Sequence, residues 1–410
     1  MGGVEKMNQY FADLHIHLGG SSEGTPVKIT ASRKLTFDAV INECVNRKGI
    51  DIAGIVDCAC PKIIRDIEDL IKKGIIYELP EGGLLHKDRL LIIPASETEA
   101  SEGNGRLSHH IGYFPYMKNI KEFSYIMKDH IKNQELSSQQ CGLKCEELYQ
   151  IIIKCGGIPV PAHAFTPHKS IYGKVTDSIK KIFSPETLLS IPAVELGLSA
   201  DTEIADYLSE LSEMSFLTSS DAHSLGKIAR EYTVFEMERL NFTEFSLALR
   251  RNSLRRIISN FGMNPKLGKY HRSYCKKCDK VIQTPPPVLK CPYCQRDDND
   301  FIIGVLDRLT QIKDREKSKS PDFRPPYFYQ IPLEFVPGVS KRILDKLISA
   351  FGSEMAILNI ATEEEIAEVV GETLAEKIMS ARNGTLALES GGGGKYGFVK
   401  RDDKQEKFQF

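Results

Sequence analysis

Short, β-rich apolar runs alternate with segments of helical periodicity from Tyr10 to about Asn260. A polar segment follows each apolar run, as in IDIAGIVDC, RLLIIPASETEA, HHIGYFP, GGIPVPAHA, IPAVELGLSA and MSFLTSSDAH. Helix-like stretches lie between the runs, among them Phe37–Arg47, Ile63–Lys72 and Phe123–Asn133. This repeated strand-then-helix order predicts an α/β fold with a parallel sheet, and over this length it favours a (β/α) barrel.

The pattern changes at about Leu267. A cysteine-rich module runs to about Asp300, a charged and Pro-rich linker joins Arg308 to Tyr327, and two helix–turn–helix patterns follow from Ile331 to about Asn383. We therefore predict four regions. They are a barrel over 1–265, a cysteine-rich module over 266–305, a linker over 306–328 and a helical region with a C-terminal tail over 329–410.

The composition is that of a globular protein, with 410 residues, 41% of them hydrophobic and 27% charged. No apolar run approaches the roughly 20 residues of a membrane span, and MGGVEKMNQYF lacks the apolar core of a signal peptide. We expect a cytoplasmic, nucleoid-associated protein without a membrane partner. In that compartment, the ten cysteines indicate metal binding or free thiols rather than disulfides.

Charge is unevenly distributed although the net charge is only −1. The stretch from Arg250 to Lys280 is strongly basic. Such a stretch alone is most often a solvated helix face, but its position before the cysteine cluster favours contact with phosphate.

Histidines and acids follow nearly every predicted strand, where barrel enzymes carry their active sites. His15 and His17 in DLHIHL are two residues apart, so both imidazoles point to one face of a strand. The other members follow along the chain: Asp57, Glu97, His109, His163, Glu195, Asp221 and His223. Imidazole and carboxylate together suit Zn²⁺, Mn²⁺ or Fe, and a set this large predicts two or three metal ions. A lone histidine is more often structural, and only one of His109 and His110 is expected to face the metals.

Four further polar residues lie near the predicted barrel mouth. Glu195 and Asp201 in ELGLSAD are candidate catalytic acids, which would orient water or protonate the leaving oxygen. For both acids, an equally good interpretation is a carboxylate that holds a histidine tautomer. Lys227 and Arg230 are candidates for a phosphate clamp, and an Arg230–Glu231 surface pair is the alternative.

The cysteine-rich module carries CKKC and CPYC, separated by 12 residues. Two such knuckles supply four thiolates for a closed, structural Zn²⁺ site, made by Cys275, Cys278, Cys291 and Cys294. Nearby lysines make DNA contact plausible.

The helical region contains IPLEFVPGVSKRILDKLISAF, which is similar to a helix–hairpin–helix motif. This motif presents backbone N–H groups to a DNA phosphate, here in the hairpin of Gly338, Val339 and Ser340, with Lys341 and Arg342 placed to meet the charge of the DNA backbone. A second pattern around Gly371 resembles a degenerate copy, and its acidic flanks favour structural packing.

The order of the barrel motifs resembles the PHP (polymerase and histidinol phosphatase) family of metallophosphoesterases, which fold as a distorted (β/α)₇ barrel. The resemblance implies metal ligands at His15, His17, Glu97, His109, His163, Asp221 and His223, with Glu97 bridging. Asp57-Cys58 stands where the family often has Asp-His. We take Asp57 as the ligand there, which leaves the third metal position open.

The full order of modules, with the GGGGKYG tail, resembles the endonuclease Q family. The resemblance implies nicking of DNA on the 5′ side of uracil, hypoxanthine, xanthine and abasic sites, with Zn²⁺, Mg²⁺ or Mn²⁺ in the barrel and the damaged nucleotide flipped out. Phe114, Phe165 and Tyr172 are candidates to stack on the base or fill its place, although aromatic residues at such positions more often belong to the core. The terminal QEKFQF is similar to tails that bind the replication sliding clamp.

Three other functions share some of these features. A small-molecule phosphatase would need the barrel ligands but neither ribbon nor hairpins, and a DNA-binding protein with a relic barrel predicts lost ligands. A proofreading exonuclease of the same family would release nucleotides from a 3′ end instead of leaving one internal nick.

Overall fold

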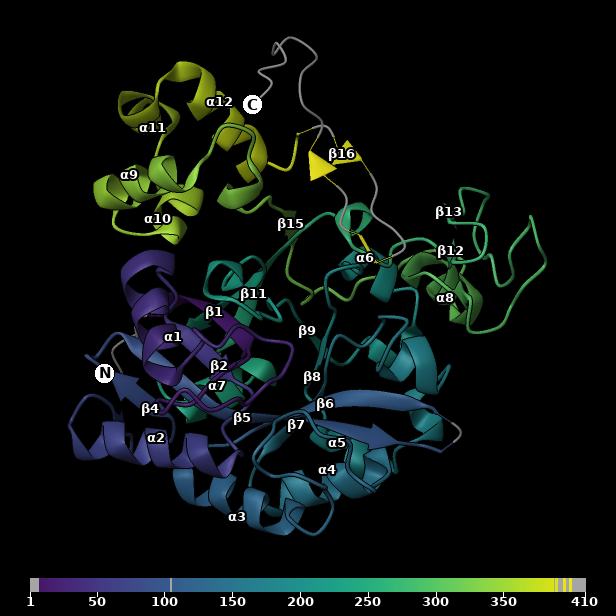
Figure 1. The fold of residues 1–410 in the computed structure, drawn as a ribbon, viewed down its shortest axis with the longest axis horizontal. Helices are drawn as coiled ribbons and strands as arrows, with labels where there is room; N and C mark the ends of the chain where they lie inside the picture. The colour runs from purple at the N-terminus through teal and green to yellow at the C-terminus, as the bar shows by residue number, and fades with distance from the viewer. Residues whose placement is uncertain (1–6, 104, 387, 390–393, 396–397, 400–410) are drawn as a thin grey trace.

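Seven strands in the described part of the chain form a closed, distorted barrel in the computed structural model (Figure 1). They are β1 (Asn8–Ile16), β2 (Ile52–Ile55), β5 (Leu90–Ser101), β6 (Leu107–Tyr113), β7 (Ile158–Pro161), β8 (Ala193–Glu195) and β9 (Ser215–Leu217). Backbone pairing joins β1, β2, β5, β6 and β7 in that order, and joins β8 to β9. Two links complete the ring: Ala164 N–H donates to the Glu195 carbonyl, and Ala222 pairs with Ile16.

The structure describes residues 7–103, 105–386, 388–389, 394–395 and 398–399. The C-terminal QEKFQF, and with it the predicted clamp-binding tail, lies outside the described residues. None of the helices in these ranges is both long and apolar enough to cross a bilayer.

The barrel sheet is mixed, whereas the sequence pattern predicted a parallel one. β1, β2 and β5 are parallel, but β6 runs antiparallel to both β5 and β7. The cause is the short connection between these strands, because only five residues separate Ser101 from Leu107 and the Glu102 N–H donates to the Arg106 carbonyl. A turn of this length can only make a hairpin, because a parallel neighbour needs a crossover of about a dozen residues.

Helices cover the outside of the barrel. They are α1 (Phe37–Glu43), α2 (Pro61–Lys72), α3 (Met117–Met127), α4 (Cys145–Lys154), α5 (Pro185–Ser190), α6 (Thr202–Ala205) and α7 (Phe242–Leu249). In α2, Ile63 and Ile67 are one helical turn apart, and both are fully buried on the face of the helix that packs against the sheet. The helix predicted over Phe123–Asn133 instead begins at Met117 and ends at Met127.

A register shift in β1 brings the HxH pair into the barrel. Ala12 and Leu14 belong to the apolar cluster that fills the barrel interior, whereas Ile16 belongs to the outer cluster beneath the helices. Strict alternation would therefore turn His15 and His17 outward. The irregularity between Asp13 and Ile16 changes the phase of the strand, so both imidazoles reach the interior.

The segment predicted as a linker is part of the barrel's surface. It contains α8 (Val305–Ile312) and ends in β15 (Tyr327–Tyr329), which pairs in parallel with β11 (Arg256–Gly262). β10 (Tyr232–Met237) joins β11 to β1, and the hairpin of β3 (Tyr77–Glu78) and β4 (Leu84–His86) extends β5. Within the segment, the Arg324 guanidinium binds the Asp206 carboxylate and lies 3.5 Å from the Phe216 ring centre.

Two smaller units project from different sides of the barrel (Figure 1). The cysteine-rich unit holds β12 (Tyr274–Cys275), β13 (Lys280–Val281) and β14 (Phe301–Ile302). The helical unit holds α9 (Lys341–Phe351), α10 (Glu354–Asn359), α11 (Glu363–Val370) and α12 (Glu372–Arg382). The buried ion pair Lys48–Glu354 and the hydrogen bond between Tyr232 and Asn359 join the helical unit to the barrel.

Candidate metal centre and active site

The first ligand group is His15, His17 and Asp221, whose ligand atoms lie within 4.8 Å of one another. The two imidazoles come from the end of β1, and Asp221 comes from the turn after β9. Asp221 Oδ1 lies 3.6 Å from His15 Nε2 and 3.5 Å from His17 Nε2. Asp221 has a φ of +47°, in the left-handed region that costs a non-glycine residue energy. Such strain is typical of a residue held in place by its function.

The second ligand group is Glu97, His109 and His163, which meets the same 4.8 Å limit. Glu97 Oε1 lies 2.7 Å from His109 Nδ1 and 3.5 Å from His163 Nε2. The same oxygen lies 3.5 Å from His15 Nε2 in the first group. Glu97 therefore stands between the two groups, in the position of a bridging carboxylate. His109 faces the site, while His110 is buried between Ser108 and Tyr149.

Each of these four imidazoles gives its second nitrogen to another polar side chain. His15 Nδ1 lies 3.0 Å from Glu195 and His17 Nδ1 lies 3.1 Å from Asp57. The remaining two pairs are His109 Nε2 with Glu99 and His163 Nδ1 with Thr166. Partners of this kind fix the tautomer and orientation of metal-binding histidines. The donor set therefore fits divalent cations of the Zn²⁺ or Mn²⁺ type.

Two acids predicted to act directly at the metals lie one layer behind them. Asp57, expected as a ligand, accepts hydrogen bonds from His17 Nδ1 and from Leu18 N–H, so it supports His17 from behind and belongs to neither ligand group. Glu195, expected as a catalytic acid, binds His15 and the backbone N–H of His163. The alternative interpretation of Glu195 as a tautomer-holding carboxylate agrees with these contacts. Cys58 is buried in the outer core, and burial raises the pKa of its thiol.

Asp201 belongs to the fold rather than to the ligand groups. Its carboxylate accepts the Ile204 N–H at the start of α6 and the Tyr329 hydroxyl of β15. The two contacts join α6 to the end of the sheet. Because these partners hold the Asp201 carboxylate away from both ligand groups, the contacts do not support its predicted role as a catalytic acid.

The buried histidines and carboxylates of the candidate centre shift one another's pKa values. Burial alone would lower the pKa of His15, but the carboxylates of Glu195 and Asp221 raise it well above its ordinary value. Burial would raise the pKa of Glu97, but His109 and Lys28 hold it well below its ordinary value. The carboxylates are therefore ionised and ready to bind cations.

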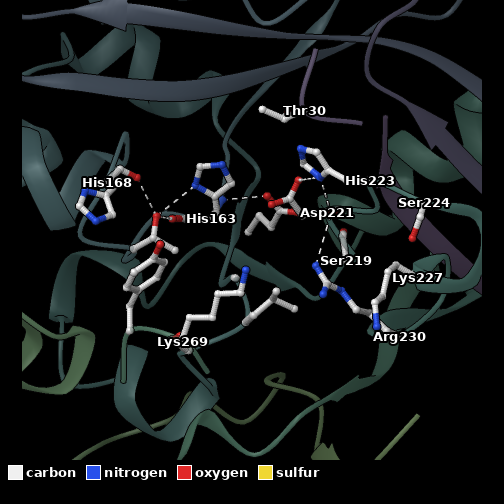
Figure 2. Close-up of a pocket in the computed structure, with 16 residues that line it drawn as sticks. Thr30, His163, His168, Ser219, Asp221, His223, Ser224, Lys227, Arg230 and Lys269 are labelled. Atoms are coloured by element: carbon white, nitrogen blue, oxygen red, sulfur yellow. Dashed lines mark hydrogen bonds and ion pairs between the residues drawn. The ribbon is translucent and has the colours of Figure 1, made fainter. Parts of the chain in front are cut away.

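A cavity of about 520 Å³ opens beside both ligand groups (Figure 2). His163 and His168 lie on one side, and Lys227 and Arg230 lie on the other. His223 lines the cavity, where its ring centre is 4.6 Å from that of His17, but it belongs to neither ligand group.

The two predicted phosphate-clamp residues differ in their present contacts. Arg230 Nε donates to the Ser220 carbonyl and Nη2 to that of Asp221, which holds the guanidinium at the cavity wall. Lys227 Nζ binds Glu334, 2.6 Å away, in the turn before α9. The alternative prediction, a surface ion pair between Arg230 and Glu231, does not fit the structure. Glu231 is fully buried and accepts the Met263 N–H.

The aromatic residues that the sequence predicted to stack on a base do not line this cavity. Phe114, Phe165 and Tyr172 are at most 1% exposed and pack in the outer core, so they cannot stack on a flipped base. The aromatic residue at the cavity is Tyr270, next to Lys269, at the entrance to the cysteine-rich unit. Both lie in the basic stretch that the sequence had marked for phosphate contact.

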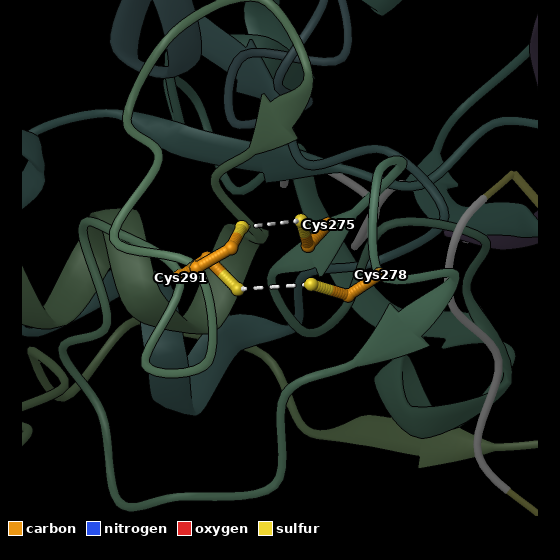
Figure 3. Close-up of side chains that lie close together, drawn as sticks. Cys275, Cys278 and Cys291 are labelled. Atoms are coloured by element: carbon orange, nitrogen blue, oxygen red, sulfur yellow. Dashed lines mark hydrogen bonds between the residues drawn. The ribbon is translucent and has the colours of Figure 1, made fainter.

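The four cysteines form a closed cluster in the described residues (Figure 3). Cys275 Sγ lies 3.7 Å from Cys294 Sγ, and Cys278 Sγ lies 3.9 Å from Cys291 Sγ. Tetrahedral Zn–S bonds of about 2.3 Å place the sulfurs roughly 3.8 Å apart. The cluster therefore has the dimensions of a structural zinc site.

The first helical hairpin has a shorter first arm than predicted. Residues Leu333–Phe335 make one 3₁₀ turn, and α9 begins after Ser340, whose hydroxyl accepts the Ile343 N–H. Gly338 has a φ of +100° and is exposed, as are Lys341 and Arg342. In the second hairpin, Gly371 alone joins α11 to α12.

Comparison with known proteins covers nearly the whole chain. No family model matches it. It is 42% identical to the uncharacterized protein YqxK of Bacillus subtilis (strain 168) over 395 residues, which is 96% of this chain and 100% of YqxK. Among solved structures, the lesion-specific endonuclease PfuEndoQ from Pyrococcus furiosus is 29% identical with a TM-score of 0.81, and 98% of each chain is covered. Endonuclease Q bound to a 27-mer duplex with an abasic lesion at the active site is 30% identical with a TM-score of 0.82, covering 97% of this chain and 98% of that one. The chain belongs to the endonuclease Q family.

The similarity to the endonuclease Q structures extends over nearly the whole chain. Because the endonuclease Q structures match 97–98% of this chain, the likeness includes the cysteine-rich and helical units as well as the barrel. The fold predicted from the sequence, a PHP-type barrel followed by a four-cysteine unit and C-terminal helices, is confirmed.

Proposed function

We propose that this protein is a metal-dependent DNA endonuclease that nicks a strand on the 5′ side of uracil, hypoxanthine, xanthine and abasic sites. The observation that carries the proposal is the position of buried Glu97 between two ligand groups, each of which contributes a residue, Asp221 or His163, to the wall of one open cavity. The endonuclease Q complex with an abasic lesion at its active site supports damaged DNA as the substrate class.

The two ligand groups would hold divalent cations, which activate water and neutralise charge on a phosphodiester. Asp221 has a side chain that is 31% exposed, and together with His163 it borders the substrate space. Arg230 lies on the same wall, where its guanidinium would donate to a phosphate oxygen. Glu195 and Asp57 keep the imidazoles in place during the reaction.

The cavity supports recognition of a nucleotide that has left the stack. Its volume of about 520 Å³ falls within the range of small-ligand sites, roughly 300–1,000 Å³. Thr30, Ser199 and Ser219 supply hydroxyl groups to its wall. Extrusion costs least for a mispaired or missing base, which gives part of the selectivity.

The C-terminal units would hold the undamaged duplex around the lesion. Gly338, Ser340 and Lys341 are exposed at the start of α9, where backbone N–H groups and side-chain charge meet a phosphate. Lys276, Lys277 and Lys280 are exposed on the cysteine-rich unit. These contacts recognise backbone, so the lesion itself is selected at the barrel.

The test uses the full chain with Mg²⁺ or Mn²⁺ and duplexes that carry one uracil, hypoxanthine, xanthine or abasic site. We expect a single nick 5′ to the lesion and none in the matched undamaged duplex. Stepwise loss of nucleotides from a 3′ end would indicate an exonuclease instead. Equal cutting of the undamaged duplex would refute damage specificity.

Asp221→Ala should lower the nicking rate by on the order of 100-fold or more, because it removes one ligand of the first group. Asp129→Ala is the control, since Asp129 is an exposed acid after α3. Binding of the damaged duplex, measured by fluorescence anisotropy, should stay near that of the unchanged protein. Wild-type nicking by Asp221→Ala would overturn the assignment of the metal centre.

A further inference from the structure

A buried lysine stands beside the bridging carboxylate. Lys28 belongs to the loop between β1 and α1, and its side chain is only 12% exposed. Its Nζ lies 2.9 Å from Glu97 Oε2. This ammonium–carboxylate contact is an ion pair, so Lys28 places a positive charge beside Glu97.

The loop holds this ammonium group in place. Lys28 N–H donates to the Leu18 carbonyl and Val27 N–H to that of Gly19, which ties the loop to the end of β1. Lys62 of α2 anchors the same loop through the Pro26 carbonyl. Lys28 is therefore a fixed part of the site and not a mobile surface chain.

The contact determines how Glu97 presents its two oxygens. Oε2 binds Lys28 and lies 3.5 Å from His17 Nε2, and Oε1 faces His109, His15 and His163. A carboxylate held at one oxygen cannot rotate freely about its terminal bond. Lys28 thus keeps Oε1 directed at both ligand groups.

The same region offers no third set of ligands. Asp57 is occupied by His17 and Leu18, and Cys58 packs into the core. Within the described residues of the barrel, the potential metal-binding groups are the two already named. The acids Glu97 and Asp57 nevertheless need positive charge beside them, because buried carboxylates are costly without it.

We propose that Lys28 is a positioning residue that takes the place of a third metal ion, so that the barrel holds two cations and the ammonium group orients Glu97 between them. The inference rests on the proposed function for its catalytic consequence, but its prediction for metal binding is independent of DNA.

The test compares Lys28→Met and Lys28→Arg with the wild-type chain. Lys48→Met is the matched control, because Lys48 is also a buried lysine paired with a buried glutamate but binds Glu354 and the Gly226 carbonyl instead of the metal ligands. Metal content is measured by mass spectrometry after loading with Zn²⁺ or Mn²⁺, and Mn²⁺ affinity by titration. Nicking is measured on the abasic duplex.

We expect wild type to take up two ions in addition to the one in the cysteine cluster. Lys28→Met should bind Mn²⁺ about threefold or more tightly, because a nearby positive charge is gone. Its nicking rate should fall about tenfold or more, because Glu97 is no longer held. Lys28→Arg should restore wild-type affinity and part of the rate, and Lys48→Met should not tighten metal binding.

Opposite shifts in affinity and rate separate this role from a structural one, which would weaken both. Three barrel ions in wild type, or weaker Mn²⁺ binding by Lys28→Met, would overturn the proposal. Expected metal binding without a nick at any lesion would count against the proposed function alone.

Discussion

At the scale of single residues, the metal centre is built from pairs rather than from isolated ligands. His15 depends on Glu195 and His17 on Asp57, and each carboxylate also accepts a backbone N–H. These bonds fix the imidazoles before any cation binds, so binding loses little side-chain entropy. Sequence reasoning missed Glu99, although it lies two residues after Glu97 on the same strand face.

Glu231 makes stability depend on pH. The carboxyl is fully buried, its Oε2 has no hydrogen-bond partner in the described residues, and burial raises its pKa from the ordinary 4.5 to about 8. Between these two values the folded protein binds more protons than the unfolded chain, so the free energy of unfolding falls as the pH rises. The total loss is on the order of a few kcal/mol.

Glu231→Gln should remove this pH dependence, because the amide has the same shape and does not ionise. Urea midpoints at about pH 5.5 and about pH 9 give the measurement. The wild-type midpoint should drop more than that of Glu231→Gln. Equal drops in the two proteins would mean that Glu231 is already ionised when folded.

At the scale of elements, the turn before α9 has a strained backbone and is exposed to solvent. Gly338 has a φ of +100° in the turn before α9, and Gly352 has a φ of +87° at the C-terminal end of that helix. Both glycines occupy backbone conformations that side chains rarely adopt. Only Gly338 lies at the predicted phosphate contact.

Gly338→Val and Gly352→Val should both destabilise the helical unit by about 1–3 kcal/mol, because valine is strained at positive φ. Only Gly338→Val should also weaken binding to an undamaged duplex, by about tenfold, since it displaces the backbone donors. Anisotropy titrations at several salt concentrations separate the two variants. Equal loss of DNA affinity in both would place the contact elsewhere on the helical unit.

At the scale of the molecule, the segment before β15 fastens the C-terminal units to the barrel. Arg324 and Asp206 form an ion pair whose side chains are 1% and 0% exposed, and Arg324 also donates to the Leu211 carbonyl. A buried pair of this kind stabilises little overall, but removing one partner leaves a charge without compensation.

Asp206→Ala should therefore lower the free energy of unfolding by about 3–5 kcal/mol. The double variant Asp206→Leu/Arg324→Met should lose less, because no buried charge is left. Urea unfolding of the three chains provides the comparison. A double variant that is less stable than Asp206→Ala would show that the ion pair itself stabilises the fold.

The sequence by itself determined which chemical groups this protein carries and in what order. The HxH pair, the ordered histidines and acids, and the two cysteine knuckles are local patterns, and their residue types already specify metal chemistry. The strand-then-helix alternation indicated the barrel, because side-chain periodicity is a local property of the chain.

Only the tertiary structure decided which polar groups meet. Asp57 lies 40 residues from His17, and Glu195 lies 180 residues from His15, so no local pattern could distinguish a ligand from its supporting acid. The irregularity in β1, the burial of Phe165 and the contact of Lys28 with Glu97 also depend on packing between distant segments. Hydrogen-bond partners and burial are properties of the folded chain, and they determine the role of each acid and lysine in this site.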